Sequence, residues 1–282
     1  MPRRSWLFVP GADEAAHAAA ARSGADVIIL ELEDFTPPEL RARARALSGK
    51  AFASWRAAGA VAAVRVNPLE TCGREDLAGL ARADLVMMSK VAAPEQVRAL
   101  EQATAGAADL VPNIESAAGL RRAFDIAKAS PRVIAMLIAS EDTVADLGTE
   151  RSRGGEELAY VRARFLVECR AAGVEAIDCP YTFSDAKGAA ADARHAKRLG
   201  YRMKALVEPS HAAAINKVLT PDFARAAKIV AAFEKARAQG KERAKLGGLM
   251  IEVPVYAAAK RILQAWNGSA GRTPPPPRRK AR

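Results

Sequence analysis

Acidic side chains directly follow a short apolar segment near the start of this sequence. Residues 27–38 read VIILELEDFTPP, so four apolar residues precede Glu31, Glu33 and Asp34. The apolar run is typical of a buried strand, which places the carboxylates where that strand ends. Carboxylates gathered at one place repel one another unless a cation lies between them. Oxygen ligands of this kind suit a hard divalent ion, for which we expect Mg²⁺, with Mn²⁺ as the alternative.

The same arrangement recurs along the chain. We expect eight strands, over residues 4–9, 26–32, 61–66, 85–91, 109–114, 133–138, 174–178 and 202–207. The first ends in the segment FVPG, residues 8–11, and the second in Glu33-Asp34. The other six end in or near polar residues, namely Arg65, Asn67, Lys90, Glu115, Glu141, Asp142, Asp178, Lys204 and Glu208.

Segments with helical spacing separate these strands. They cover residues 13–23, 39–57, 74–81, 94–105, 117–129, 155–172, 185–198 and 209–217. Strict alternation of strand and helix indicates parallel strands joined by crossover helices. An open doubly wound sheet is one solution, but eight repeats favour a closed (β/α)8 TIM barrel. In such a barrel the carboxyl ends of the strands form one mouth, so the polar residues should meet there.

The pattern changes after residue 220. We expect the barrel to span residues 1–220, followed by a C-terminal helical extension or lid over residues 221–267 and a proline-rich basic tail, disordered, over residues 268–282. In the extension, Thr220 and Gly240 bound one predicted helix, and residues 254–265 form a second after the loop KLGGLMIEVP.

Composition excludes several classes of protein. A membrane-spanning helix needs about 18 consecutive apolar residues, and no apolar segment of the sequence approaches that length. The N-terminus does not resemble a signal peptide. Three widely spaced cysteines make no disulfide framework or metal motif, so we expect a reducing, cytoplasmic location. His17 and His195 should lie on helix surfaces, which leaves no zinc cluster.

Net charge alone does not indicate a nucleic-acid partner. The chain carries a formal charge of +11, but five of those charges lie in the last eleven residues. The rest are scattered through helices, and only 5% of residues are aromatic, which is few for base stacking. We therefore expect small-molecule partners and neither nucleic acid nor membrane.

Several motifs together resemble a known family. The chain contains RSWLFVPG, GADVIILELED, VRVN, PNIESAAGL, SEDTVADLG, AIDCPYT and MIEVPVYAAAKRIL, in this order, over residues 3–265. This set is similar to the citrate lyase beta-subunit family within the HpcH/HpaI aldolase superfamily, which includes citryl-, malyl- and citramalyl-CoA lyases. The resemblance implies a TIM barrel that binds Mg²⁺ and cleaves or forms a carbon–carbon bond next to a thioester. It also implies a homo-oligomer, with a trimer favoured.

The resemblance also implies roles for particular residues. Glu115 and Asp142 match the metal carboxylates, and Arg65 matches the arginine that binds the oxo-acid or the enolate oxygen. Glu33 and Asp34 match an acid pair that orders water near the metal. The remaining matches concern substrate binding, by the backbone of Ala139, Ser140 and Glu141 for the oxo-acid carboxylate and by Arg4 with the FVPG segment for coenzyme A.

Four positions depart from the family pattern. Ala139 stands where glycine is usual, Glu208 where histidine is usual, and Glu31 and Glu252 where aspartate is usual. In relatives the acid at position 252 reaches the site of a neighbouring subunit, so Glu252 is a candidate for proton transfer. The longer side chain changes the reach of that acid, which can alter the rate.

These observations predict a Mg²⁺-dependent lyase acting on an acyl-CoA thioester and a 2-oxo acid. A malyl-CoA thioesterase could use the same metal site with water as the nucleophile. A Schiff-base aldolase would instead use Lys90 or Lys204, although nearby acids would keep either amine protonated. A non-catalytic barrel, whose basic tail binds RNA or an acidic partner, is the alternative outside enzymes.

Overall fold

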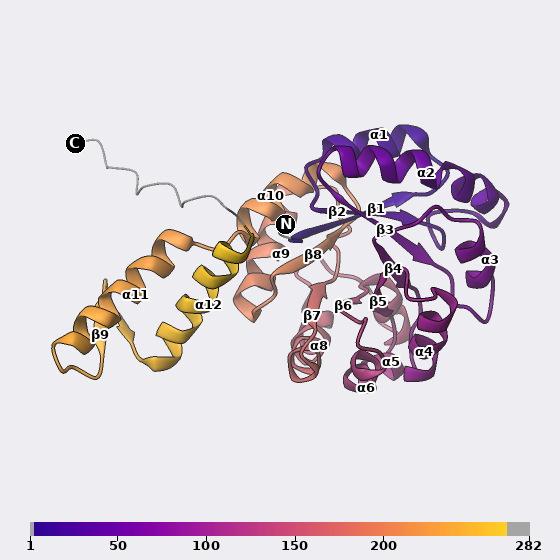
Figure 1. Cartoon of the computed structure of the whole chain (residues 1–282). Coiled ribbons are helices and arrows are strands. Elements are labelled where there is room, and N and C mark those ends of the chain that lie inside the picture. Colours follow the sequence, from indigo (N-terminus) through magenta and orange to yellow (C-terminus); the bar gives the residue numbers. More distant parts are fainter. Residues whose placement is uncertain (1–2, 270–282) are drawn as a thin grey trace. The chain divides into compact units, whose positions relative to one another are not determined.

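Eight parallel strands close into a barrel in the computed structural model, which describes residues 3–269 and the side chains of residues 3–264 (Figure 1). Each strand pairs with the next in sequence, and β1 pairs with β8 to close the ring. This confirms the predicted TIM barrel. The strands are β1 Ser5–Pro10, β2 Val27–Glu31, β3 Val61–Val66, β4 Leu85–Met88, β5 Asp109–Ile114, β6 Ala135–Ile138, β7 Glu175–Asp178 and β8 Met203–Leu206.

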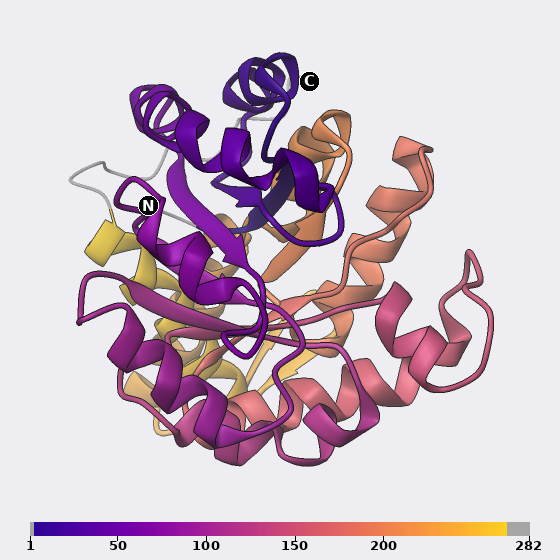
Figure 2. The same ribbon diagram turned by 90° about the vertical axis from the view of Figure 1, so that its right-hand side faces the viewer.

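Helices cover the outside of this barrel, as Figure 2 shows. They are α1 Glu14–Arg22, α2 Arg41–Ala57, α3 Gly73–Ala78, α4 Pro94–Ala103, α5 Ala117–Arg121, α6 Ala123–Lys128, α7 Glu141–Asp146, α8 Ala159–Ala172, α9 Ala186–Leu199 and α10 Ala212–Leu219. Three short 3-10 helices, Pro38–Leu40, Glu156–Leu158 and Pro209–His211, precede α2, α8 and α10.

Two helical details differ from the prediction. The segment expected to be one helix over residues 117–129 is divided at Arg122, whose backbone leaves the helical region with φ −105° and ψ 11°. The short helix α7 was not predicted, because six residues are too few to show helical periodicity. It begins immediately after β6 and carries Glu141 and Asp142 in its first turn.

Alternation along the strands separates two apolar layers. Trp6, Val27 and Met87 belong to the cluster inside the barrel. Their neighbours Leu7 and Ile28 belong to the larger cluster that packs the strands against the helices. Because successive side chains of a strand point to opposite faces, a shift of one residue moves a side chain from one layer to the other.

Residues from Thr220 onward form a separate compact unit. It contains α11 Phe223–Ala238, the hairpin strands β9 Ala244–Leu246 and β10 Leu249–Ile251, and α12 Val253–Ser269. Its core includes Ile229, Phe233 and Ile251, and the rings of Phe233 and Tyr256 stack with centroids 4.6 Å apart.

Two predictions for this unit are wrong, and a third concerns residues that the structure does not describe. Asp222, rather than Thr220, is the N-cap of α11, because its carboxylate accepts a hydrogen bond from the Arg225 backbone at 2.9 Å. The predicted loop is a hairpin whose two turn residues, Gly247 and Gly248, have φ of 51° and 81°, values that suit a tight two-residue turn. Residues 270–282, most of the tail predicted to be disordered, lie outside the described residues.

One histidine lies in a different environment from the one predicted. His17 is buried rather than exposed, because its ring packs edge-on against Trp55 and its Nε2 lies 3.1 Å from the Pro10 carbonyl oxygen. Cys72, Cys169 and Cys179 are all free thiols. Within residues 3–269, each helix is too short or too polar to cross a membrane.

Candidate functional site

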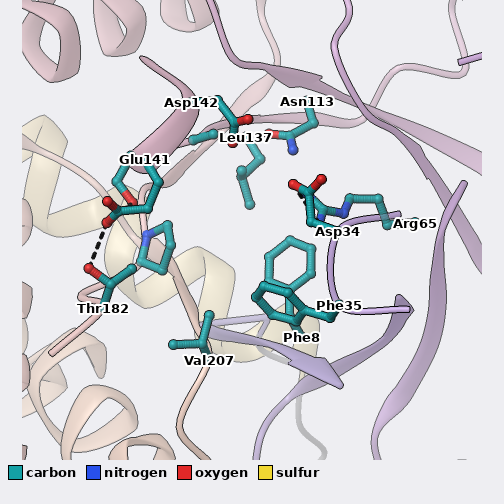
Figure 3. Close-up of a pocket in the computed structure, with 13 residues that line it drawn as sticks. Phe8, Asp34, Phe35, Arg65, Asn113, Leu137, Glu141, Asp142, Thr182 and Val207 are labelled. Carbon is teal, nitrogen blue, oxygen red and sulfur yellow. Dashed lines mark hydrogen bonds and ion pairs between the residues drawn. The ribbon is translucent and has the colours of Figure 1, made fainter. Parts of the chain in front are cut away.

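A pocket opens at the carboxyl ends of the barrel strands (Figure 3). Residues from seven of the eight strand–loop units contribute to it, which is the arrangement expected of a site at the mouth of a barrel. The residues that line it are Phe8, Asp34, Phe35, Arg65, Asn113, Leu137, Ala139, Ser140, Glu141, Asp142, Pro180, Thr182 and Val207.

Glu115 lies just behind this lining and is only 4% exposed. Its Oε1 accepts a hydrogen bond from the amide of Asn113, which lines the pocket. Its Oε2 and the Asn113 Oδ1 are both buried without a hydrogen-bond partner among the described residues. Unpaired buried acceptors cost free energy, so these two oxygens favour a proton or a cation beside them.

The electrostatics of Glu115 agree with that geometry. Burial above all, with the charges of Asp142 and Glu33, raises its pKa to about 8, against the opposing effect of the Arg65 guanidinium. A carboxyl with so high a pKa holds its proton near neutral pH unless a cation replaces it. Glu115 and Asp142 therefore influence each other electrostatically, as two ligands of one ion would.

Arg65 on β3 connects the acidic groups. Its Nε lies 2.9 Å from Glu31 Oε1, its Nη2 3.2 Å from Glu33 Oε2 and its Nη1 3.8 Å from Glu115 Oε1. The guanidinium carbon lies 5.0 Å from the centre of the Phe8 ring, a cation–π arrangement. Burial opposes the positive charge, but the surrounding carboxylates, Glu31 first, raise the pKa of Arg65 above its usual value.

Glu31 explains why a buried strand ends in carboxylates. Its two oxygens accept hydrogen bonds from the backbone N–H groups of Glu33 and Phe35, each at 2.6 Å. Glu31 thus folds the loop after β2 and fixes Arg65 at the same time. This role was not predicted from the sequence, which placed Glu31 among the carboxylates at the end of the strand and in the position of the usual aspartate.

Glu33, Asp34 and Lys90 form the rim beside Arg65. Glu33 is 5% exposed and bonds to the Lys90 ammonium, while Asp34 Oδ1 lies 3.6 Å from the same nitrogen. Burial raises the pKa of Glu33. Burial lowers the pKa of Lys90, but the bond to Glu33 and the charges of Glu33, Asp34 and Glu115 together outweigh burial and raise this pKa overall. Lys90 also has a left-handed backbone, with φ of 55°, a strained conformation that is enriched at functional sites.

The segment between β6 and α7 carries the predicted oxo-acid residues. Ala139, Ser140 and Glu141 line the pocket. The Ala139 N–H already donates to the Ile114 carbonyl oxygen at 2.9 Å, which corrects the expectation that this amide receives the substrate carboxylate. The Glu141 carboxylate accepts a hydrogen bond from the Thr182 hydroxyl at 2.7 Å, a pocket residue that the sequence did not single out.

Asp178 and Lys204 do not reach this pocket, contrary to the sequence-based expectation. Both side chains are fully buried in the outer layer, where Lys204 Nζ lies 2.6 Å from Asp178 Oδ2 and 2.5 Å from Asp192 Oδ2. Arg162 of α8 completes the cluster, with Nη2 2.7 Å from Asp178 Oδ2. The cluster links β7 and β8 to α8 and α9, and its acids raise the pKa of Lys204 despite burial.

Three other predicted residues are not among the residues that line the pocket. Arg4 immediately precedes β1 and pairs with Asp26, which precedes β2, at 2.8 Å. It therefore lies at the amino ends of the strands, opposite the FVPG segment, and the structure does not bring it to the pocket. Glu208 is exposed after β8. Glu252 belongs to the separate unit from Thr220 onward, where its carboxylate is 3.5 Å from Arg243 Nε.

The residues present fit a divalent cation such as Mg²⁺. Within the described residues no group of three or more histidine, cysteine, aspartate or glutamate side chains forms a complete cage. Mg²⁺ does not need one, since it binds through one or two carboxylates together with water and substrate oxygens. Glu115, with an unpaired buried oxygen, and Asp142, at the pocket, supply that number of carboxylates.

A closed parallel barrel with a pocket at the carboxyl ends of the strands has the architecture of (β/α)8 barrel enzymes. The family model described as HpcH/HpaI aldolase/citrate lyase matches residues 4–209, and the chain belongs to that family.

Individual relatives extend the similarity over nearly the whole chain. Citrate lyase subunit beta from Haemophilus influenzae is 33% identical, over 93% of this chain and 96% of its own length. A (3S)-malyl-CoA thioesterase from Cereibacter sphaeroides is 31% identical, over 93% and 94%. Among solved structures, CitE from Mycobacterium tuberculosis in complex with magnesium, acetoacetate and coenzyme A superposes with a TM-score of 0.75 at 27% identity, over 93% and 97%.

Proposed function

We propose that this chain is a Mg²⁺-dependent carbon–carbon lyase that cleaves or forms a 3-hydroxyacyl-CoA thioester such as malyl-, citramalyl- or citryl-CoA. The observation that carries the proposal is the buried Glu115 carboxylate, with one oxygen unpaired among the described residues, beside Arg65 at a pocket lined by Asp142. Membership of the family and its magnesium-bound relative support the same chemistry.

In this proposal Glu115 and Asp142 hold the ion, with Mn²⁺ as a substitute. When bound, the ion withdraws electron density from the carbonyl of the 2-oxo acid. Ser140 and Glu141 contribute backbone N–H groups at the start of α7 for the carboxylate of that acid, since the first amides of a helix have no partner within it. Arg65 donates to the oxygen that becomes negative as the carbon–carbon bond breaks.

Proton transfer is assigned to two sets of residues. Glu33 and Asp34 lie beside Arg65, and Asp34 lines the pocket, so this pair can order a water molecule there. Glu252 of a neighbouring copy is the second donor or acceptor that we propose, since its half-exposed carboxylate belongs to the separate C-terminal unit. This assignment requires a homo-oligomer, for which we propose a trimer.

A thioesterase is the second candidate, favoured by the relative that bears that name. It would use the same carboxylates, but water would attack the thioester carbon and release free coenzyme A. A Schiff-base aldolase is disfavoured, because the pKa of Lys90 and that of Lys204 are both raised and each ammonium is paired with acids. A non-catalytic scaffold would not need the unpaired oxygens of Glu115 and Asn113.

The purified chain should be incubated with malyl-CoA or citramalyl-CoA in Mg²⁺ and separately in EDTA. A lyase releases acetyl-CoA and the 2-oxo acid in Mg²⁺ only, whereas a thioesterase releases free coenzyme A and the intact hydroxy acid. Glu115→Gln should abolish turnover, while Glu252→Gln should mainly slow it. Turnover that persists unchanged in EDTA would contradict the metal-dependent mechanism.

A further inference from the structure

The pocket has two chemically different sides. Figure 3 shows Phe8, Phe35 and Val207 on the side opposite Asp142 and Asn113. Leu137, Ala139 and Pro180 add further apolar surface to the lining. Six of the thirteen lining residues are therefore apolar, and three others, Asp34, Glu141 and Asp142, are acids.

Only one cation, Arg65, is among these lining residues, all of which the structure describes. Its guanidinium already faces Glu31, Glu33 and Glu115 within 3.8 Å. Two cations outside the lining are also paired with acids. Lys90 is bonded to Glu33. Arg151 Nη1 lies 2.6 Å from Glu157 Oε1, and its Nε lies 3.7 Å from Oε1 of the lining residue Glu141.

This distribution of charged and apolar side chains affects which group the 2-oxo acid can carry besides its first carboxylate. Oxaloacetate, released from citryl-CoA, carries a second carboxylate, whereas pyruvate and glyoxylate carry a methyl group or hydrogen. A second carboxylate moved into this pocket loses hydration, the cations near it already face acids, and those acids repel it. A methyl group loses no such hydration and gains contact with the apolar side.

Resting on the proposed lyase function, we infer that the pocket selects 2-oxo acids with a single carboxylate and a small apolar substituent, and that Val207 is a specificity-determining residue. The substrates are then thioesters of the citramalyl-CoA type rather than citryl-CoA. Cleavage removes the proton of the tertiary hydroxyl and breaks the adjacent carbon–carbon bond. The bond electrons pass to the thioester enolate, which takes up one proton, so citramalyl-CoA yields pyruvate and acetyl-CoA with no oxidant or reductant.

The test compares kcat/KM for citramalyl-CoA and citryl-CoA in Mg²⁺, with the released 2-oxo acid trapped as its phenylhydrazone. The wild type should prefer citramalyl-CoA by about a hundredfold or more, because an unpaired polar group in a site costs at least as much as a misfitted methyl group. Val207→Lys brings an ammonium group to the apolar side and should shift the ratio toward citryl-CoA by about tenfold or more. Val207→Met, of similar length and without charge, should not.

The outcomes separate the inference from the function on which it rests. Cleavage of citryl-CoA at a kcat/KM equal to or above that of citramalyl-CoA overturns the inference and leaves the lyase function standing. Equal shifts in Val207→Lys and Val207→Met overturn the role of charge at this position. Absence of cleavage of every thioester, including malyl-CoA, by the wild type refutes the proposed function itself.

Discussion

Replacement of Glu115 by glutamine should stabilise the metal-free protein, by an amount that grows with pH. Burial raises the pKa of this carboxyl from its ordinary value of 4.5 to about 8 in the folded protein. Below pH 4.5 both states are protonated and the group does not oppose folding. Between these two values the unfolded chain loses the proton that the folded chain keeps, so stability falls as pH rises.

The size of this effect follows from the shift. Each pKa unit corresponds to about 1.4 kcal/mol, so the wild type loses about 3 kcal/mol by pH 7 and approaches about 5 kcal/mol above pH 8. Glutamine does not ionise, and Glu115→Gln escapes this loss. For a barrel of this size each kcal/mol shifts Tm by about 2–4 °C, so the variant should melt about 6–12 °C above the wild type at pH 7.

The assay is thermal unfolding of both proteins in EDTA from about pH 5 to about pH 9. The two melting curves should nearly coincide at the acidic end and diverge as pH rises. Saturating Mg²⁺ should then raise the Tm of the wild type more than that of the variant, because ligand binding to the folded state stabilises it. A Tm difference that is constant across this pH range, or a variant that melts below the wild type at pH 9, would contradict a raised pKa of Glu115 in the folded protein.

Two further substitutions test other parts of the structure. Arg65→Lys should lower kcat/KM about a hundredfold or more, because an ammonium cannot span Glu31 and Glu33 or direct a fixed donor to the reacting oxygen. The control is Arg56→Lys, at the surface, which should leave kcat/KM unchanged. A kcat/KM of Arg65→Lys equal to that of the wild type would contradict this role of Arg65. Lys204→Met should destabilise the chain by about 3 kcal/mol or more, since two buried carboxylates are then left with Arg162 as their single cationic partner. Exposed Lys50→Met should change Tm little, and similar melting of both lysine variants would count against the buried cluster.

The strand–helix alternation was sufficient to predict the barrel, and the positions of carboxylates after strands predicted which end holds the pocket. Sequence position gave the height of a residue along the barrel but not the direction of its side chain. Asp178 follows Ile177, which points inside the barrel, so Asp178 points to the outer layer and binds Lys204. Strand alternation could have revealed this, and the chain direction could have placed Arg4 at the amino end.

Other features of the site depend on contacts that no periodicity encodes. The two backbone hydrogen bonds of Glu31 require the exact path of the loop after β2. Likewise, Thr182 reaches Glu141 only because the loops after β6 and β7 come together in the fold. The sequence indicated an acidic mouth, whereas the division of the pocket into an acidic and an apolar side emerged only from the structure.

The most direct test of the central proposal is anomalous scattering from a crystal of the protein grown with Mn²⁺ in place of Mg²⁺ and soaked with pyruvate. Mn²⁺ bound as proposed gives an anomalous peak within coordination distance of carboxylate oxygens of both Glu115 and Asp142, and this peak is absent in Glu115→Gln crystals. An empty pocket between these two residues, in crystals of protein whose activity requires the metal, would contradict it.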